Sequence, residues 1–355
     1  MIRIGMLHHR KDPRTVIKAY PYAAIAKAEG AELIYFSPKR VDFKQKTILG
    51  FIYENGDWQE KELPFPDVIY NAGSPEKLNK SIEIINRLKK TIPFTTHSIG
   101  NKMNVYKRLK EAGKFSQYLI PSEIVKDSRH FFDFLDLYRK VVLKPVNGRK
   151  GQDINLIERI GDQFRLLKGN VETIQSYEEL RSFINEKLKE ESHIIQPYLM
   201  CRTTDGNPFD FRLHVQKNGE GKWVITSIYP RIGPSGSIVS NINQGGSMNY
   251  LEPFLKQQFG NDFFNIKRYL EKFALRLAEH IEELQQKHFS ESIDELGIDA
   301  ALDNMKKLWI YEVNWRPGCP PTFYLEMDVV QNMIRYCKYL ANEHHKEDLL
   351  KGGGK

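Results

Sequence analysis

The chain contains 355 residues, of which 41% are hydrophobic and 28% are charged, so it is long enough for two or three domains and has the composition of a globular protein. The formal net charge is +8, but no dense basic stripe or nucleic-acid module accompanies it, and a nucleotide or an acidic substrate would account for the charge. No apolar run approaches the ~20 residues that span a bilayer, and the N-terminus does not resemble a secretory signal. We expect a cytoplasmic protein with no membrane or nucleic-acid partner.

The three cysteines, Cys201, Cys319 and Cys337, are too few and too far apart for a disulfide framework or a zinc site. Cys319 lies next to a motif described below, but a nucleophilic role would require a His or Asn partner. No such partner is evident, so we expect no chemistry from the cysteines.

The first part of the chain alternates between strands and helices. In chain order we expect a strand at 2–7, a helix at 20–30, a strand at 31–37, a hairpin at 46–63 that turns at Asn55-Gly56-Asp57, a strand at 64–71 and a helix at 76–90. This alternation predicts a small α/β domain at 1–96.

The middle of the chain carries further elements of both kinds. We expect helices at 101–113, 131–138 and 177–190, strands at 120–125, 141–146 and 193–199, and a hairpin at 154–169. We assign residues 97–200 to a first lobe of a larger unit.

From about residue 201 the chain becomes rich in strands. We expect strands at 209–216, 222–232, 297–303 and 308–315, a long amphipathic helix at 262–289 and a C-terminal helix. We assign residues 201–345 to a second lobe and 346–355 to a flexible tail. The fold class predicted for the whole chain is mixed α/β (α+β).

The strongest group of candidate site residues is Asp299, Glu312 and Asn314, which interrupt two apolar strands. If these strands pair antiparallel through the short loop between them, Asp299 faces Glu312. Asn314, two residues on, points to the same side. Two carboxylates and an amide on one face suit Mg²⁺, which prefers oxygen ligands. The alternative is a half-exposed hairpin with its polar residues turned outward.

Lys144 ends an apolar strand and precedes a loop with Gly148 and Gly151. Glycines let backbone N–H groups approach a phosphate closely, so Lys144 and this loop are candidate phosphate ligands. A surface hairpin with basic residues would show the same pattern. Lys102, at the start of a predicted helix, is open to the same two interpretations.

Two later segments carry polar residues that could contact a nucleotide or an anion. Pro197 interrupts the strand at 193–199, which leaves backbone groups free to bond an adenine edge. Asp210 and Arg212 share one face of the next strand. Arg231 precedes a loop rich in Gly, Ser and Asn that includes Asn241, and arginine binds phosphate or carboxylate through two hydrogen bonds.

The order of these motifs along the chain resembles the ATP-grasp superfamily. The order is Lys102, Lys144 with its glycine loop, QPYL, DFR, PR…SNINQGG and D…EVNWRPG. The N-terminal stretch is similar to the YheC/YheD endospore coat-associated group, and the run from DFRLHV to SNINQGGS is similar to glutathione synthetase-like enzymes and to ligases that add glutamate to ribosomal protein. The resemblance covers residues 1–340. It implies a small N-terminal domain followed by two lobes that clamp ATP.

The resemblance implies that ATP and Mg²⁺ are the cofactors, and it gives each position a role. The residues implied to bind the nucleotide are Lys102, Lys144, Gly148, Gly151, the adenine hinge Gln196, Pro197, Tyr198 and Leu199, and Asp210 near the ribose. The residues implied to hold Mg²⁺ are Asp299, Glu312 and Asn314, and those implied to assist phosphoryl transfer are Arg212, Arg231 and Asn241. Two positions depart from the usual pattern: Gln196 replaces a frequent Glu, and Arg316 replaces a small residue.

The activity implied is ATP-dependent ligation of a carboxylate to an amine through an acyl phosphate, with small molecules or peptides as substrates. Two alternatives stay open at this point: a kinase with the same fold that phosphorylates a hydroxyl, and a spore-coat protein that binds nucleotide without turnover. The sequence also leaves open a homo-oligomer and an association with the spore.

Overall fold

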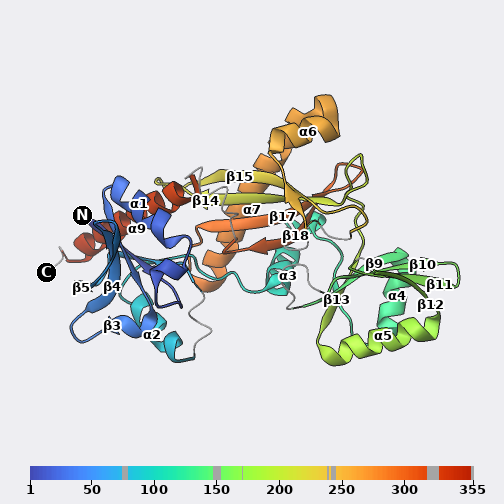
Figure 1. The fold of residues 1–355 in the computed structure, drawn as a ribbon, viewed down its shortest axis with the longest axis horizontal. Coiled ribbons are helices and arrows are strands. Elements are labelled where there is room, and N and C mark those ends of the chain that lie inside the picture. Colours follow the sequence, from blue (N-terminus) through green and yellow to red (C-terminus); the bar gives the residue numbers. More distant parts are fainter. Residues whose placement is uncertain are drawn as a thin grey trace.

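The computed structural model describes residues 1–73, 79–146, 153–169, 171–237, 240, 245–317 and 328–352. In these residues the strands form three sheets, and helices pack against each of them (Figure 1). The mixed α/β class that the sequence predicts is confirmed.

The first sheet contains seven strands in the order β3-β4-β2-β1-β6-β7, with β5 paired to β4. Its elements are β1 (Ile2–Leu7), α1 (Ala19–Ala28), β2 (Ala31–Phe36), β3 (Val41–Asp42), β4 (Thr47–Glu54), β5 (Asp57–Pro64), β6 (Val68–Asn71), α2 (Asn79–Lys89) and β7 (Phe94–Thr95). The predicted hairpin is confirmed: Asn55 and Gly56 both have positive φ, as a two-residue turn between twisted strands requires.

The second sheet contains six strands in the order β12-β11-β10-β9-β13-β8. Its elements are β8 (Glu123–Ile124), α4 (Ser128–Tyr138), β9 (Lys140–Pro145), β10 (Asn155–Ile160), β11 (Gln163–Lys168), β12 (Val171–Gln175), α5 (Tyr177–Glu190) and β13 (His193–Pro197). The structure has α5 at the predicted bounds, because Ser176 and Glu179 form a capping box at its N-terminus. The strand expected at 120–125 is reduced to the two residues of β8.

The third sheet contains five strands in the order β16-β15-β14-β17-β18 and lies between the other two (Figure 1). Its elements are β14 (Phe209–Lys217), β15 (Trp223–Ile232), β16 (Ser247–Met248), α6 (Leu251–Phe259), α7 (Phe263–Phe289), β17 (Glu295–Leu302) and β18 (Leu308–Asn314). The long helix α7 packs its apolar stripe against this sheet, as Leu270, Leu277 and Ile298 share one core. The helix α6 was not expected from the sequence.

Two helices pack far from their neighbours in sequence. Helix α3 (Lys102–Ala112) places Val105 and Leu109 in the core of the third sheet. Helix α9 (Asp328–Gly352) returns to the first sheet, where Met333 and Cys337 pack with residues of β1 and α1. The domain boundaries at 96, 200 and 345 stay predictions. In the described residues, no helix is both long and apolar enough to span a membrane.

A buried carboxylate joins the first and third sheets. Asp294, just before β17, is 2% exposed and accepts hydrogen bonds from the backbone N–H and the hydroxyl of Thr96. Burial, together with the charge of Glu295, raises the pKa of Asp294 from 3.8 to about 7 against the effect of the Thr96 hydrogen bonds. The folded chain therefore holds this proton more tightly than the unfolded chain, and the stability contributed by the proton is lost as the pH rises toward 7.

We expect Asp294→Asn to remove this part of the pH dependence, because the amide keeps the shape of the side chain but cannot ionise. The quantity to compare is the free energy of unfolding of the variant minus that of the wild type. This difference should be larger at about pH 8 than at about pH 5, by roughly 1–4 kcal/mol. Urea unfolding at both pH values measures the difference. The same difference at both would contradict the raised pKa.

Candidate active site

The candidate site lies on the face of the third sheet opposite its apolar core. Strand side chains alternate, and Phe211, Leu213, Ile298 and Ala300 face the core. Arg212, Asp299 and Glu312 lie on the other face, and we call these three residues the row on the third sheet. In this row Arg212 lies opposite Asp299, and Asp299 lies opposite Glu312.

The predicted pairing of β17 and β18 is confirmed. The two strands run antiparallel, Asp299 pairs with Glu312, and Asn314 pairs with Gly297. A register shift between Asp299 and Ala300 marks a bulge at this point, a common feature beside active sites. The Asn314 amide nitrogen donates a hydrogen bond of 2.9 Å to Glu312.

Asp299 is the centre of a buried network with two arginines. It is 5% exposed, and its carboxylate accepts from Arg212 through Nε at 2.5 Å and through Nη2 at 3.3 Å. The Nη2 atom of Arg231 lies 3.1 Å from Oδ2 of Asp299. Burial alone would raise the pKa of Asp299, but the two guanidinium groups outweigh it and lower the pKa below its ordinary value. Asp299 is therefore charged at neutral pH.

Asp210 holds Arg231 from the other side. Both of its carboxylate oxygens accept from Arg231, through Nε and Nη2, at 2.7 Å each, and both residues are less than one-tenth exposed. This two-point contact fixes the plane of the guanidinium group. A contact between Asp210 and the ribose, which the resemblance implies, stays a prediction, since the structure gives this carboxylate a partner within the protein.

The two candidate phosphate lysines come together beside Glu312. The Nζ atom of Lys102, at the start of α3, lies 2.6 Å from Oε2 of Glu312. Strand alternation in β9 turns Val141 and Leu143 into the core, so Lys144 points to the other side. Desolvation, followed by the charge of Lys102, lowers the pKa of Lys144 to about 8, and Glu312 offsets part of this effect.

These residues line one narrow cleft between the second and third sheets. Lys144 and Gln196 contribute from β9 and β13, Lys102 from α3, and Glu312 from β18. The cleft has a volume of about 30 Å³, roughly the space of one water molecule. A nucleotide would therefore require the second sheet to move away from the third, or the lining side chains to turn.

The predicted hinge lies at the edge of this cleft. Strand β13 ends at Pro197, two residues before the predicted end, but Pro197 does not stop the backbone pairing as predicted. The Gln196 amide donates to the Ser122 hydroxyl at 2.5 Å, and the N–H of Tyr198 donates to the carbonyl of Lys140 at 2.9 Å. Leu199 follows immediately, and its carbonyl accepts from the N–H of Cys201.

Three predicted site residues, Gly148, Gly151 and Asn241, lie outside the described residues. Ser122 was not predicted, although it lines the cleft and bonds Gln196. Nothing in the sequence singles it out, because its partner lies 74 residues away. Cys201 is buried, and burial raises the pKa of its thiol to about 12, whereas Cys319 lies outside the described residues.

Residues 91–340 match the family model described as YheC/D like ATP-grasp. The chain belongs to the YheC/D-like ATP-grasp family. Two relatives come from Bacillus subtilis (strain 168). The endospore coat-associated protein YheD is 26% identical over 88% of this chain and 72% of its own length. The endospore coat-associated protein YheC is 23% identical over 90% of this chain and 91% of its own length.

The ATP-grasp fold is also that of solved structures. The ATP-grasp ligase PsnB, determined with a minimal precursor, Mg and ADP, superimposes with a TM-score of 0.54 over 96% of this chain and 98% of that one, at 12% identity. The predicted ATP-grasp fold is therefore confirmed. In this YheC/D-like protein Glu312 of the row and the two lysines line the cleft between the second and third sheets.

The donor set of this YheC/D-like protein fits a hard cation. Asp299, Glu312 and Asn314 offer carboxylate and amide oxygens on adjacent strands. Among the described residues no cluster of three or more His, Cys, Asp or Glu side chains suits a metal. Two carboxylates nevertheless suffice for Mg²⁺, which keeps several waters and binds phosphate oxygens. Lys102 would have to leave Glu312 before the metal could bind through that carboxylate.

Proposed function

We propose that this protein is an ATP-dependent ligase that joins a carboxylate to an amine. The observation that carries the proposal is the row of Arg212, Asp299 and Glu312, flanked by Arg231 and by Lys102. This arrangement sets fixed positive charge beside a pair of carboxylates, which is the chemistry that phosphoryl transfer requires. ATP-grasp ligases such as PsnB share the fold.

The nucleotide would occupy the cleft between the second and third sheets. We assign the phosphates to Lys102 and Lys144, both of which line it. The adenine would lie along the hinge from Gln196 to Leu199, with Asp210 near the ribose as the resemblance implies. The loop with Gly148 and Gly151 would cover the phosphates.

Asp299, Glu312 and Asn314 would hold Mg²⁺, which would neutralise charge on the phosphates of the nucleotide. The pKa of Asp299 is already lowered, so this residue needs to lose no proton to bind a cation. Glu312 would hold the cation in place of Lys102, and the ammonium group of Lys102 would then bind a phosphate.

In the reaction, an oxygen of the substrate carboxylate would attack the γ-phosphorus of ATP and ADP would leave. The amine would then attack the carbonyl carbon of the acyl phosphate, lose a proton and release inorganic phosphate. Arg212 and Arg231 would neutralise the negative charge of the transferring group and of the acyl phosphate. Asn241 would assist them, and Asp210 would keep the guanidinium of Arg231 in place.

The names of YheC and YheD point to a second candidate function. Both relatives are named endospore coat-associated proteins, which favours a protein at the spore coat that binds nucleotide without turnover. The two candidates differ in one outcome. Incubation with ATP, Mg²⁺, a library of carboxylic acids and hydroxylamine should yield a hydroxamate if an acyl phosphate forms. Nucleotide binding with neither hydroxamate nor ADP formed would favour the coat protein.

Lys144→Ala should weaken the binding of a non-hydrolysable ATP analogue about tenfold to a hundredfold. The expected loss is that of one charge-assisted contact, roughly 1.5–3 kcal/mol. Calorimetric titration of the analogue with Mg²⁺ measures it. Lys168→Ala on β11 of the same sheet removes a lysine that does not line the cleft, and it is the matched control. Equal affinities for both variants would place the phosphates elsewhere.

A further inference from the structure

A second pocket lies where the first sheet meets the third. Its volume is about 300 Å³, large enough for an amino acid or a similar small molecule. From the first part of the chain it is lined by His8 and by Lys18, the N-cap of α1; from the last part it is lined by Glu295 of β17 and by Arg316 and Pro317, which follow β18. No motif of the sequence indicated that these residues meet.

The surroundings of Lys18 disfavour a positive charge. It stands at the N-terminus of α1, where the helix dipole repels positive charge. Its Nζ atom donates to the Tyr70 hydroxyl at 3.1 Å and lies over the Tyr70 ring, and no carboxylate of the described residues is within ion-pair distance of it. Desolvation lowers the pKa of Lys18 to about 8; Glu295 opposes the change, and Arg316 adds to it. A bound anion would give Lys18 a partner of opposite charge, and it would offset both the helix dipole and the effect of burial on the ammonium group.

The Lys, Arg, Asp and Glu side chains that line the pocket among the described residues are two cations and one anion. Lys18 and Arg316 are cationic and Glu295 is anionic. His8 is neutral at pH 7, because desolvation and the neighbouring cations lower its pKa to about 3. The N–H of Arg10 donates to Nδ1 of His8 at 3.0 Å, so Nε2 carries the remaining hydrogen and is a donor. A single negative charge matches this pocket better than the nearly double charge of a phosphate.

Gly297 lies between the pocket and the candidate site on β17. Glu295, Gly297 and Asp299 alternate onto one face of β17, so Glu295 and Asp299 lie about 13 Å apart along the strand. Gly297 lies midway. A Cβ atom at this glycine would overlap Pro317, which lines the pocket, and would lie 3.2 Å from Nη1 of Arg212. The absence of a side chain at Gly297 therefore lets Arg212 and the pocket wall approach each other.

We propose that this pocket binds the second carboxylate of a small dicarboxylic substrate, whose other carboxylate lies beside Arg212 and is activated there. Lys18 and Arg316 hold the second carboxylate, and Nε2 of His8 donates to it. The inference rests on the proposed function, because it names the substrate class of the same site.

The test is calorimetric titration of the full chain saturated with Mg²⁺ and a non-hydrolysable ATP analogue. The probes are succinate, glutarate, L-aspartate and L-glutamate, with their monoamides succinamate, glutaramate, L-asparagine and L-glutamine, and with O-phospho-L-serine, for comparison. At least one dicarboxylate should bind, and its monoamide should bind at least tenfold more weakly. No binding by any of the four dicarboxylates, or tighter binding of phosphoserine than of all four, would overturn the proposal.

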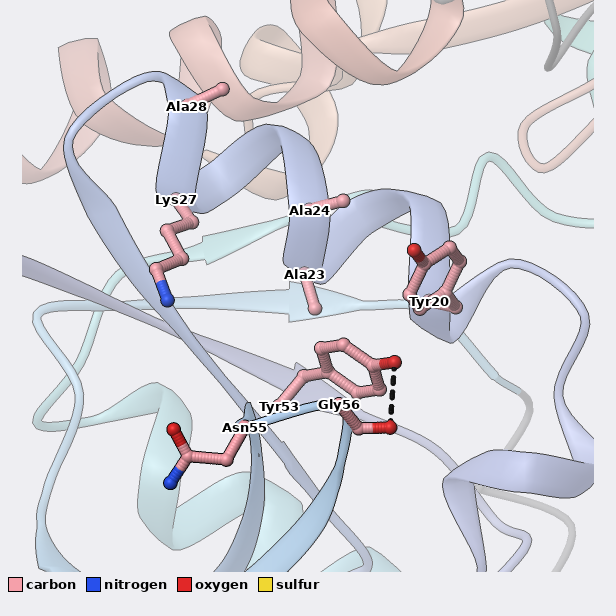
Figure 2. A pocket seen from close by; sticks show the side chains of 8 residues that line it. All are labelled: Tyr20, Ala23, Ala24, Lys27, Ala28, Tyr53, Asn55 and Gly56. Atoms are coloured by element: carbon pink, nitrogen blue, oxygen red, sulfur yellow. Dashed lines mark hydrogen bonds between the residues drawn. The ribbon is translucent and has the colours of Figure 1, made fainter.

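Lys18→Met should weaken dicarboxylate binding about tenfold to a hundredfold, the loss of one charge-assisted contact. Lys27→Met is the matched control: Lys27 belongs to the same helix but lines a different pocket, beside Asn55 and Gly56 of the β4–β5 turn (Figure 2). Arg316→Gln provides a second variant in case Lys18→Met is unstable. Equal losses in Lys18→Met and Lys27→Met would contradict the assignment.

A failure of the pocket assignment can be distinguished from a failure of the proposed ligase activity. If a dicarboxylate binds through Lys18 but no ADP or hydroxamate is formed, the pocket assignment stands and the proposed ligase activity fails. If monocarboxylic acids are activated as well as dicarboxylic ones, the ligase activity stands and the pocket assignment fails.

Discussion

Glu312→Gln should keep the fold and lower the rate of ATP turnover by at least ~10²–10³. The side chains are nearly the same size, so the packing of β18 against β17 should not change. The variant loses the negative charge that a metal requires, and it also loses the ion pair of 2.6 Å with Lys102. Turnover with Mg²⁺ and the affinity for a non-hydrolysable ATP analogue are the two measurements.

The control for this variant is Glu158→Gln. Glu158 also pairs with basic side chains, Lys140 and Arg165, but it lies on β10 outside the cleft. Its replacement should leave turnover within twofold of the wild type, roughly the effect of a surface ion pair. If Glu312→Gln turned over ATP as fast as Glu158→Gln, the row on the third sheet would not be the metal site.

Arg231→Lys should retain nucleotide binding and slow product formation by ~10²–10³, the usual cost of removing one donor from the transition state. The guanidinium group donates two hydrogen bonds of 2.7 Å to Asp210, and its Nη2 atom lies 3.1 Å from Oδ2 of Asp299. An ammonium group keeps the charge but cannot make this fork, so its position relative to the transferring group is lost.

Arg165→Lys serves as the comparison for Arg231→Lys. Arg165 contacts two carboxylates, Glu158 and Glu172, on the exposed side of the second sheet. Single-turnover measurements separate the chemical step from binding. An Arg231→Lys variant whose chemical step is as fast as that of Arg165→Lys would show that this arginine does not act on the transferring group.

The sequence allowed the pairing of Asp299 with Glu312 to be predicted, because this pairing depends on local information. GIDAALD and LWIYEVNW are separated by a short loop, and strand alternation then brings Asp299 and Glu312 to one face. Helix α5 and the hairpin at Asn55-Gly56 were predictable for the same reason, since a capping box and a turn dipeptide are local signals.

Other features depend on the order of strands in the sheets and on contacts between distant segments. The ion pairs of Asp299 with Arg212 and Arg231 exist because β14 lies between β15 and β17, an order that no local pattern determines. Lys18 and Arg316 line one pocket although they are almost 300 residues apart in the chain. Helix α6 was missed because its sequence follows a run rich in Gly, Ser and Asn that indicates a loop.

The fate of the carboxylate oxygens tests ligation most directly. A substrate acid whose carboxylate carries isotopically labelled oxygen is incubated with ATP, Mg²⁺ and an amine, and the products are analysed by mass spectrometry. An acyl phosphate passes one of these oxygens to phosphorus, so we predict one labelled oxygen in the released inorganic phosphate and an amide heavier than the acid by the amine less one water. ADP formed together with a stable phosphorylated acceptor, and unlabelled phosphate with no amide, would contradict the account.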